Sequence, residues 1–567
     1  MAKNVAIGIQ SFEDLIKGNY FYIDKTGFIK EWWDSGDSVT LITRPRRFGK
    51  TLNMSMVEQF FSVDYAGREE LFAGLSIWEH EEYRKIQGTY PVIFLSFASI
   101  KEAYYDATVY QMCHLIQKQF EKFSFLQKSD KLSDAEKAYC KRMTEEVSRM
   151  DASMALHQLS DFLYRYYGKK TIIILDEYDT PMQEAYVNGY WDELVAFTRS
   201  LFNATFKTNP YMERALMTGI TRISKESIFS DFNNPKVVTT TSDEYATCFG
   251  FTEEEVFNTL DEFGLSNEKE HVKAWYDGFT FGEYKDIYNP WSILNFIDTN
   301  GKYTTYWANT SGNRLVGKLI REGNSEIKEQ FSDLLSGKVL RVPIDEQIVY
   351  NQLDESQNAI WALLVASGYL KVMRYDRLEL LERGEKACYE LKITNHEVEL
   401  MFESMVSGWF GAKEMEYNAF IKAMLQKDKK AMNAYMNRIC LSLFSYFDTG
   451  NRPSGSEPER FYHGFVLGLM VDMQRDFIIT SNRESGFGRY DVMIEPKNPQ
   501  KDVAVIIEFK VHDAEDEKDL QDTALAALQQ IEYKKYATML EDKGIPADRI
   551  YRYGFAFEGK NVLIAVG

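Results

Sequence analysis

The stretch that most restricts the fold is the apolar run Thr171–Leu175, which is followed directly by Asp176 and Glu177. An unbroken aliphatic run, without polar alternation, predicts a strand that is buried on both faces. Such strands occur in parallel sheets covered by helices on both sides, so we expect an α/β domain here. The two acidic residues come at the carboxyl end of the strand, which is the edge where open α/β sheets bind their ligands.

A second α/β signal lies closer to the N-terminus. The sequence predicts a strand at 38–43, a loop at 44–51 and a helix at 52–61. The helix would begin with free backbone N–H groups at the loop, and a helix start of this kind binds phosphate. The order of strand, loop and helix is that of a nucleotide-binding phosphate loop.

The loop satisfies half of the phosphate-loop pattern G-x-x-x-x-G-K-[ST]. Gly49, Lys50 and Thr51 supply the second half, whereas Arg44 stands where the pattern has its first glycine. In this pattern, backbone amides and the lysine hold the phosphates, and the hydroxyl holds Mg²⁺. The generic pattern therefore fails at one position.

Polar residues at the ends of the predicted strands would complete the site. Asp176 would hold Mg²⁺ together with Thr51, and Glu177 would polarise the attacking water. A third predicted strand leads to Thr218 and Arg222, which are placed to sense the γ-phosphate. These five residues predict a site for nucleotide hydrolysis at one sheet edge.

Two further arginines, Arg46 and Arg47, lie inside the loop. Beside the phosphates they would either stabilise the transition state, as an arginine finger does, or hold the nucleotide tightly and slow its hydrolysis. Single residues keep structural alternatives: Asp176 could cap the next helix, Arg222 could be a surface cation and Lys50 could be solvated. Because the loop lysine and the polar strand ends occur in order within one α/β domain, we interpret them jointly as an NTPase.

The C-terminal part carries a different pattern, in which Asp491 is followed by Glu508 and Lys510. The segments 488–494 and 503–510 are predicted to form two strands joined by a hairpin. Side chains two apart on a strand share a face, so Glu508 and Lys510 would project together, with Asp491 alongside on the neighbouring strand. The apolar residues of the second strand would face the other way, into a core: Val505, Ile507 and Phe509.

Asp491 and Glu508 on adjacent strands can hold a hard cation, Mg²⁺ or Mn²⁺, through their oxygens. A bound cation activates water and neutralises the charge that develops on a phosphodiester during hydrolysis. Lys510 would orient or deprotonate that water. On spacing alone, a salt bridge in a surface hairpin is an equally simple explanation in a chain with 85 acidic residues.

A predicted helix follows the second strand and would pack on the sheet. Its apolar stripe has helical spacing: Leu520, Ala524, Leu528 and Ile531. The small side chains of Thr523 and Ala527 would allow a close approach. The amide of Gln530, or that of Gln529, would then reach the carboxylates.

Together, Asp491, Glu508, Lys510 and Gln530 resemble the PD-(D/E)XK nuclease superfamily. The segments 461–465 and 484–491 are similar to the version of this domain that one bacterial family carries.

This resemblance implies that His463 and Glu484 are additional ligands or orient the phosphate. A hydrogen-bonded core histidine and a turn-capping glutamate remain the alternatives. Arg489 would position a carboxylate or a phosphate.

The N-terminal loop, with Tyr22–Thr26 and Leu175–Asp179, resembles the bacterial AAA-ATPase-like proteins that carry a C-terminal PD-(D/E)XK domain. The resemblance extends through aromatic segments in the middle of the chain. It implies that the nucleotide is ATP. Three polar residues in those segments would contact nucleotide or join domains, and the sequence does not choose between these roles: Asp277, Asn289 and Asn309.

The expected fold class is α/β in three parts. Residues 1–240 would form a P-loop NTPase-like domain with a parallel sheet, and residues 241–400 a mainly helical connector. Residues 401–567 would form the PD-(D/E)XK domain, which is restriction-endonuclease-like. The length of 567 residues is sufficient for several cores.

The net charge of −19 argues against broad adhesion to nucleic acid, because nonspecific affinity comes mainly from lysine and arginine. It leaves room for a local basic groove. No apolar stretch reaches the ~18 residues needed to span a bilayer, and Val5–Ile9 is too short for a signal peptide. We therefore expect a cytoplasmic protein without a membrane partner.

These observations predict an ATP-binding and ATP-hydrolysing protein whose metal-dependent nuclease domain cleaves nucleic acid, with DNA favoured over RNA. ATP would regulate the cleavage. One alternative is a nucleotide-switched scaffold that holds nucleic acid and has an inactive nuclease domain. Another is an ATPase that remodels a partner, with a homo-oligomeric ring as one form of assembly.

Overall fold

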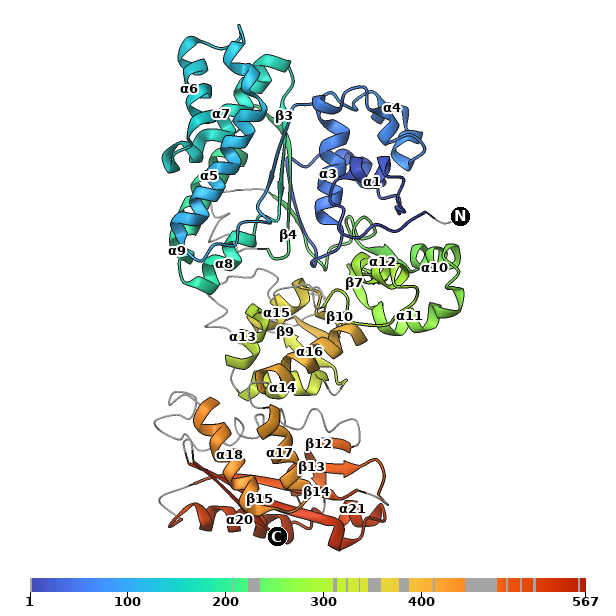
Figure 1. Cartoon of the computed structure of the whole chain (residues 1–567), viewed down its shortest axis with the longest axis vertical. Coiled ribbons are helices and arrows are strands. Elements are labelled where there is room, and N and C mark those ends of the chain that lie inside the picture. The colour runs from blue at the N-terminus through green and yellow to red at the C-terminus, as the bar shows by residue number, and fades with distance from the viewer. Residues whose placement is uncertain are drawn as a thin grey trace. The chain divides into compact units, whose positions relative to one another are not determined.

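The computed structural model describes residues 3–207, 209–222, 235–308, 314–322, 325–335, 337–344, 358–376, 387–410, 414–443, 477–485, 488–499, 502–512, 517–558 and 561–567. The chain forms two compact units (Figure 1). The first unit comprises Met1–Val316 and Val339–Glu399, and the second comprises Gly317–Lys338 and Leu400–Gly567. The nucleotide-binding region and most of the connector thus belong to one unit, while the expected boundaries at 240 and 400 stay predictions.

The first unit is built on a parallel sheet of five strands, which confirms the predicted α/β class. The strand order is β2-β3-β4-β1-β5, and every pair in it is parallel. The strands are β1 (Val39–Thr43), β2 (Val92–Ser96), β3 (Thr171–Asp176), β4 (Met212–Gly219) and β5 (Lys236–Val238). The apolar run is β3, and all six of its residues are buried.

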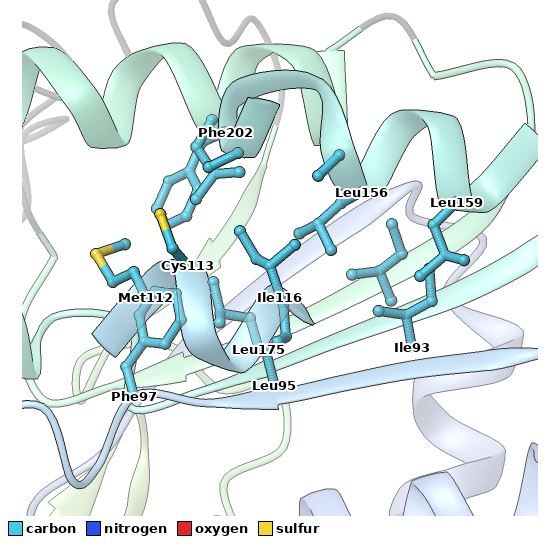
Figure 2. Packing of buried hydrophobic residues seen from close by; sticks show 14 of the residues in the cluster. Ile93, Leu95, Phe97, Met112, Cys113, Ile116, Leu156, Leu159, Leu175 and Phe202 are labelled. Carbon is cyan, nitrogen blue, oxygen red and sulfur yellow. The ribbon is translucent and has the colours of Figure 1, made fainter. Parts of the chain in front are cut away.

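Alternate residues of β3 serve two separate cores, one on each face of the sheet. Ile173 and Leu175 pack with α5 (Tyr105–Lys122), α7 (Arg149–Tyr167) and α9 (Trp191–Phe202), as Figure 2 shows for Leu175. Ile172 and Ile174 face the opposite side. That side is covered by α1 (Phe12–Lys17), α2 (Gly27–Asp34) and α3 (Lys50–Phe61). Burial on both faces explains why the run carries no polar alternation. Shorter or peripheral helices complete this region: α4 (Glu81–Arg84), α6 (Asp134–Glu145) and α8 (Thr180–Asn188).

The connector region has more helical than strand residues among those described, as expected. Its helices are α10 (Glu253–Glu262), α11 (Lys269–Tyr276), α12 (Pro290–Asp298), α13 (Arg314–Glu322), α14 (Ser325–Leu335) and α15 (Ala359–Ala366). It also holds two antiparallel sheets that the sequence did not predict. Their strands are β6 (Phe251–Thr252), β7 (Phe279–Phe281) and β8 (Tyr284–Tyr288), then β9 (Leu340–Pro343), β10 (Leu370–Tyr375) and β11 (Cys388–Ile393). Two of these strands, β6 and β7, have two and three residues, which are too few to produce a recognisable alternation.

The second unit contains a five-stranded mixed sheet of order β12-β13-β14-β15-β16. The strands are β12 (Phe477–Ser485), β13 (Gly488–Pro496), β14 (Ala504–Val511), β15 (Ile550–Glu558) and β16 (Asn561–Val566). The pair β14 and β15 is parallel, and the other three pairs are antiparallel. The predicted hairpin is β13 with β14.

Helices cover both faces of this mixed sheet. Val505, Ile507 and Phe509 pack toward α17 (Glu414–Leu425) and α18 (Lys429–Leu443), which confirms the predicted core face. The opposite face carries α20 (Leu520–Tyr533) and α21 (Thr538–Asp542). The remaining helix, α16 (His396–Phe410), begins in the first unit and continues into the second. Among the described residues, no helix combines the length and the apolarity needed to cross a bilayer.

Candidate nucleotide and nuclease sites

The loop after β1 ends at Gly49, which has φ 76° and caps the start of α3. Lys50 and Thr51 therefore lie in the first turn of the helix, slightly earlier than the predicted helix start. A left-handed backbone is accessible to glycine at little cost, so Gly49 lets the chain turn sharply from the loop into α3. The backbone amides of this helix start are oriented to receive an anion, as the sequence predicted.

Asp176 lies at the centre of a hydroxyl cluster at the carboxyl edge of the parallel sheet. Its Oδ2 accepts hydrogen bonds from Thr51 Oγ1 at 2.9 Å and from Ser96 Oγ at 3.2 Å, and its Oδ1 accepts one from Thr218 Oγ1 at 2.7 Å. Burial and the nearby Glu177 raise the pKa of Asp176. A carboxylate beside a threonine hydroxyl is a donor set that suits Mg²⁺. The cluster brings together three of the predicted site residues.

Lys50 and Glu177 form a buried ion pair, with Nζ 3.1 Å from Oε1. Burial opposes ionisation of Glu177, but the ammonium of Lys50 and the guanidinium of Arg46 outweigh it and lower the pKa of this carboxyl. Lys50 Nζ also donates to the carbonyl oxygens of Arg44 and Pro45, at 3.1 and 3.0 Å. The lysine is thus held against the loop, with the proposed water-polarising carboxylate beside it.

The arginine that replaces the first glycine has a structural role. Arg44 is fully buried, and its guanidinium donates to the carbonyl oxygens of Thr43, Thr239 and Glu244 at 2.6 to 3.1 Å. It also lies 4.4 Å from the centre of the Phe281 ring. Burial lowers the pKa of Arg44 to about 10. Arg44 therefore ties the loop to the segment after β5.

Arg46 and Arg47 border the same cavity as Lys50. Arg46 Nη2 donates to Gln183 Oε1 at 3.2 Å, and the Arg47 guanidinium lies 4.2 Å from the centre of the Trp291 ring. Arg47 has φ 66°, a conformation that is unfavourable for a residue with a side chain. Such strain occurs often at ligand-binding sites.

Arg222 lines a second, small cavity together with Thr43 and Thr239, and its proposed role at the γ-phosphate stays a prediction. Sequence reasoning missed Asp179, which lies fully buried close to Lys50 and Glu177. Its Oδ2 accepts hydrogen bonds from the backbone N–H groups of Ile220 and Thr221 at 3.0 and 2.8 Å. Asp179 thus fastens the loop after β3 to the loop after β4. The only signal for it in the sequence was a second acid two positions after Glu177.

A cavity of about 400 Å³ adjoins these residues, a volume within the usual range for a small-molecule site. Residues 46–53 form one wall, and Glu177 and Thr180 lie at the sheet edge. The other walls come from residues 6–10 and 21–23 near the N-terminus and from Pro290, Trp291 and Leu294 of α12.

Of the three polar connector residues, Asn289 contacts the loop, because its Nδ2 donates to the Arg46 carbonyl oxygen at 3.2 Å. Asp277 lies in a group of three carboxylates with Glu253 and Asp286. Asn309 falls outside the described residues.

In the second unit, β13 and β14 pair so that Val492 lies opposite Ile507. The next residues along the antiparallel ladder, Asp491 and Glu508, therefore lie opposite each other. Asp491 Oδ2 accepts a hydrogen bond from the Phe509 backbone N–H at 2.8 Å, and Glu508 is 3% exposed. Two neighbouring carboxylates, one of them buried, are a donor set that fits a divalent cation, since without a positive charge they would repel each other.

Gln530 of α20 donates from Nε2 to Glu508 Oε1, whereas Gln529 is exposed. This contact depends on close packing between α20 and β15. A Cβ placed on Gly554 would lie 2.3 Å from the Ala524 carbonyl oxygen and 3.0 Å from Ala527 Cβ. The absence of a side chain at Gly554, beside Glu508 in the parallel ladder, lets the helix bring Gln530 to the carboxylate.

Lys510 lies two residues after Glu508 on β14, half-buried, and pairs with Ala556 of β15. Tyr536 is a member of this site that the sequence did not suggest. It is buried beside Gln530, with which it hydrogen bonds, and its pKa is raised by burial and by Glu508 and Asp491. An apolar core position after the helix gives no sequence signal for such a contact.

Two further nuclease candidates are placed only by their backbones. Glu484 of β12 pairs with Arg489 of β13 in the antiparallel ladder. His463 lies outside the described residues.

Family models match the two parts of the chain that hold these candidate sites. Residues 6–229 match the family described as "Predicted AAA-ATPase", AAA-ATPase-like, and residues 457–566 match the PD-(D/E)XK nuclease superfamily. The chain thus carries an AAA-ATPase-like domain followed by a C-terminal domain of the PD-(D/E)XK nuclease superfamily. It is also similar to an Azotobacter chroococcum mcd 1 protein described as "Uncharacterized protein in vnfD 5'region". The two are 24% identical over 399 residues, which are 70% of this chain and 68% of the relative.

Proposed function

We propose that this protein is an ATP-regulated nuclease that binds and hydrolyses ATP in its first unit and cleaves nucleic-acid phosphodiesters, with Mg²⁺ or Mn²⁺, in its second. The observation that carries the proposal is the convergence of Asp491 and Glu508, on the neighbouring inner strands β13 and β14, with Gln530 of α20. We propose DNA as the favoured substrate and the cytoplasm as the location. The protein is also a candidate for assembly into a homo-oligomer. We keep 1–240, 241–400 and 401–567 as the proposed domains.

In the nuclease site, Asp491 and Glu508 would hold the cation. A divalent cation supplies an activated water and neutralises charge on the phosphate. The Phe509 N–H fixes Asp491, and Gln530 fixes Glu508, so both carboxylates keep their orientation without moving on binding. Lys510, on the same strand face as Glu508, would orient the water or accept its proton.

In the ATP site, the Gly49 turn would direct backbone amides at the phosphates, and Lys50 would bind the β- and γ-phosphate oxygens. Thr51 and Asp176 would hold Mg²⁺, which neutralises phosphate charge. Glu177 is kept ionised by Lys50 and is suited to polarise the attacking water. Thr218 would report on the γ-phosphate through its hydrogen bond to Asp176.

The test uses the full chain with single-stranded and double-stranded DNA and RNA, with Mg²⁺ or Mn²⁺, and with or without ATP. We expect DNA cleavage that EDTA stops and that Asp491→Ala and Glu508→Ala abolish, by about 10³-fold or more. Lys50→Ala should weaken ATP binding by about 10- to 100-fold, because it removes a charged hydrogen bond to phosphate.

Cleavage that survives both carboxylate variants would point to a contaminant and overturn the nuclease assignment. Nucleic-acid binding without cleavage, under every metal condition, would instead support the scaffold alternative. ATP turnover with neither binding nor cleavage of nucleic acid would leave a remodelling ATPase.

A further inference from the structure

Helix α12 contributes to the ATP cavity although it lies outside the AAA-ATPase-like match at 6–229. Pro290, Trp291 and Leu294 line the cavity together with Lys50 and Thr51. A connector helix therefore forms a wall of the site in which we propose that ATP binds.

Two contacts join the start of α12 to the arginines of the loop. Asn289 Nδ2 donates to the Arg46 carbonyl oxygen at 3.2 Å, while its Oδ1 accepts from the Trp291 N–H at 2.9 Å and caps the helix. The Arg47 guanidinium lies 4.2 Å from the centre of the Trp291 ring. Since Arg47 also lines the cavity, a phosphate that binds the N–H groups of its guanidinium would pull on the group that lies against the Trp291 ring.

The same turn of α12 is tied to a buried carboxylate on another helix. Ser292 Oγ donates to Glu397 Oε2 at 2.7 Å, and both side chains are buried. Glu397 Oε1 accepts the backbone N–H groups of Trp307 at 2.6 Å and Ala308 at 3.4 Å. A carboxylate that receives this many hydrogen bonds in a buried position has a fixed geometry, so it would transmit a displacement of Ser292.

Glu397 lies in the first turn of α16, and this helix is continuous across the boundary between the two units. The first unit ends at Glu399 and the second resumes at Leu400, both within His396–Phe410. Hydrogen bonds, one ring contact and the backbone turn Asn289–Ser292 thus connect the loop arginines with the first turn of α16, all within the first unit.

We propose that α12 is a nucleotide sensor that couples ATP binding to α16. ATP phosphates attract Arg47 away from the Trp291 ring, because charge-assisted hydrogen bonds to phosphate are stronger than a cation–π contact. The turn Asn289–Ser292 then shifts, and Ser292 carries the shift to Glu397. This inference rests on the proposed function, since it requires that ATP binds at Lys50.

The test is hydrogen–deuterium exchange of the full chain, with and without ATP and Mg²⁺, together with ATP titration calorimetry. In the wild type we expect ATP to change the exchange rate of the α16 amides by about fivefold or more. Ser292→Ala should reduce that change to less than about twofold while the Kd for ATP stays within about twofold. Glu397→Gln keeps a hydrogen-bonding side chain and should retain most of the response.

Ser153→Ala is the matched control, because it is the same substitution in α7, where Ser153 Oγ donates to the Met150 carbonyl oxygen one turn earlier in the helix. It should leave the response intact. If ATP binds to the wild type but α16 exchange does not change, the sensor is refuted and the proposed function stands. A full response in Ser292→Ala refutes the Ser292 link. If ATP does not bind at all, the proposed ATP function and the sensor fail together.

Discussion

The packing of α20 on Gly554 leads to a prediction about Gly554→Ala. The added Cβ would meet the Ala524 carbonyl oxygen at 2.3 Å and the Leu528 backbone nitrogen at 3.1 Å. Both are helix backbone atoms, so no side-chain rotation can relieve the overlap. The helix must move away by roughly 1 Å before the contact becomes an ordinary one, and overpacking of this kind costs about 1–3 kcal/mol.

The same movement would pull Gln530 from Glu508. A misplacement of about 1 Å in an active site can lower the rate about 10²-fold, so we expect cleavage to fall by about 10- to 100-fold. For a domain of this size, the packing cost corresponds to a decrease in Tm of about 3–10 °C. The assays are single-turnover DNA cleavage and thermal unfolding monitored by circular dichroism.

Gly567→Ala is the matched control, because its Cβ would come closest to the end of the Leu528 side chain, at 3.2 Å, which can rotate away, and would lie at ordinary contact distance from Arg552. This variant should keep wild-type cleavage and lose little stability. If Gly554→Ala also keeps both the wild-type Tm and the wild-type rate, the close approach of α20 is not what positions Gln530. A lowered Tm with an unchanged rate would refute only the catalytic part of the argument.

Three further predictions concern single side chains. Gln530→Ala should lower DNA cleavage by about 10- to 100-fold, because it releases Glu508. The control Gln529→Ala, on the exposed face of the same helix, should cleave at the wild-type rate. Equal cleavage rates in the two variants would contradict the role of Gln530. Arg44→Met should lower the free energy of unfolding of the first unit by about 3 kcal/mol in chemical denaturation, because three buried carbonyl oxygens lose a charged donor. A decrease of less than about 1 kcal/mol would argue against the structural role of Arg44. Burial and the neighbouring Asp286 raise the pKa of Asp277 to about 7, above the value of about 3.9 in an unfolded chain. Between pH about 4 and about 7, Asp277 therefore keeps its proton in the folded state, whereas the unfolded chain has lost it. The free energy of unfolding should decrease as the pH rises through this range. Asp277→Asn should flatten this decrease, as measured by Tm at pH 5 and pH 8, and an unchanged pH profile would show that Asp277 does not cause it.

Much of the fold was predictable because long elements carry a strong periodic signal. The apolar run of β3, the alternation of β14 and the stripe of α20 each predicted both the element and its buried face. The short connector strands escaped prediction because a strand of a few residues owes its existence to its pairing partner, which is distant in sequence for β9 and β11.

The residue types of both candidate sites were also predictable from the order in which the motifs and predicted strands follow one another along the chain. Phosphate binding was indicated by a glycine, a lysine and a threonine after one strand and by acids after another. Metal-dependent hydrolysis was indicated by the pattern of Asp491, Glu508 and Lys510. The structure decided among residues of the same type. It assigned the contact with Glu508 to Gln530 and not Gln529, because the rotation of α20 is set by its buried face of Thr523, Ala524, Ala527 and Ile531.

By itself, the sequence determined the α/β class and predicted the two proposed chemistries together with the residues proposed to carry them, because these predictions depend on local patterns. Only the tertiary structure decided that Arg44 is a buried support, that Arg222 lines a second cavity, and that α12 borders the cavity at Lys50. The physical reason is that these roles depend on contacts between residues that are far apart in the chain. Such contacts come from packing and hydrogen bonding in three dimensions, and no spacing along the chain encodes them.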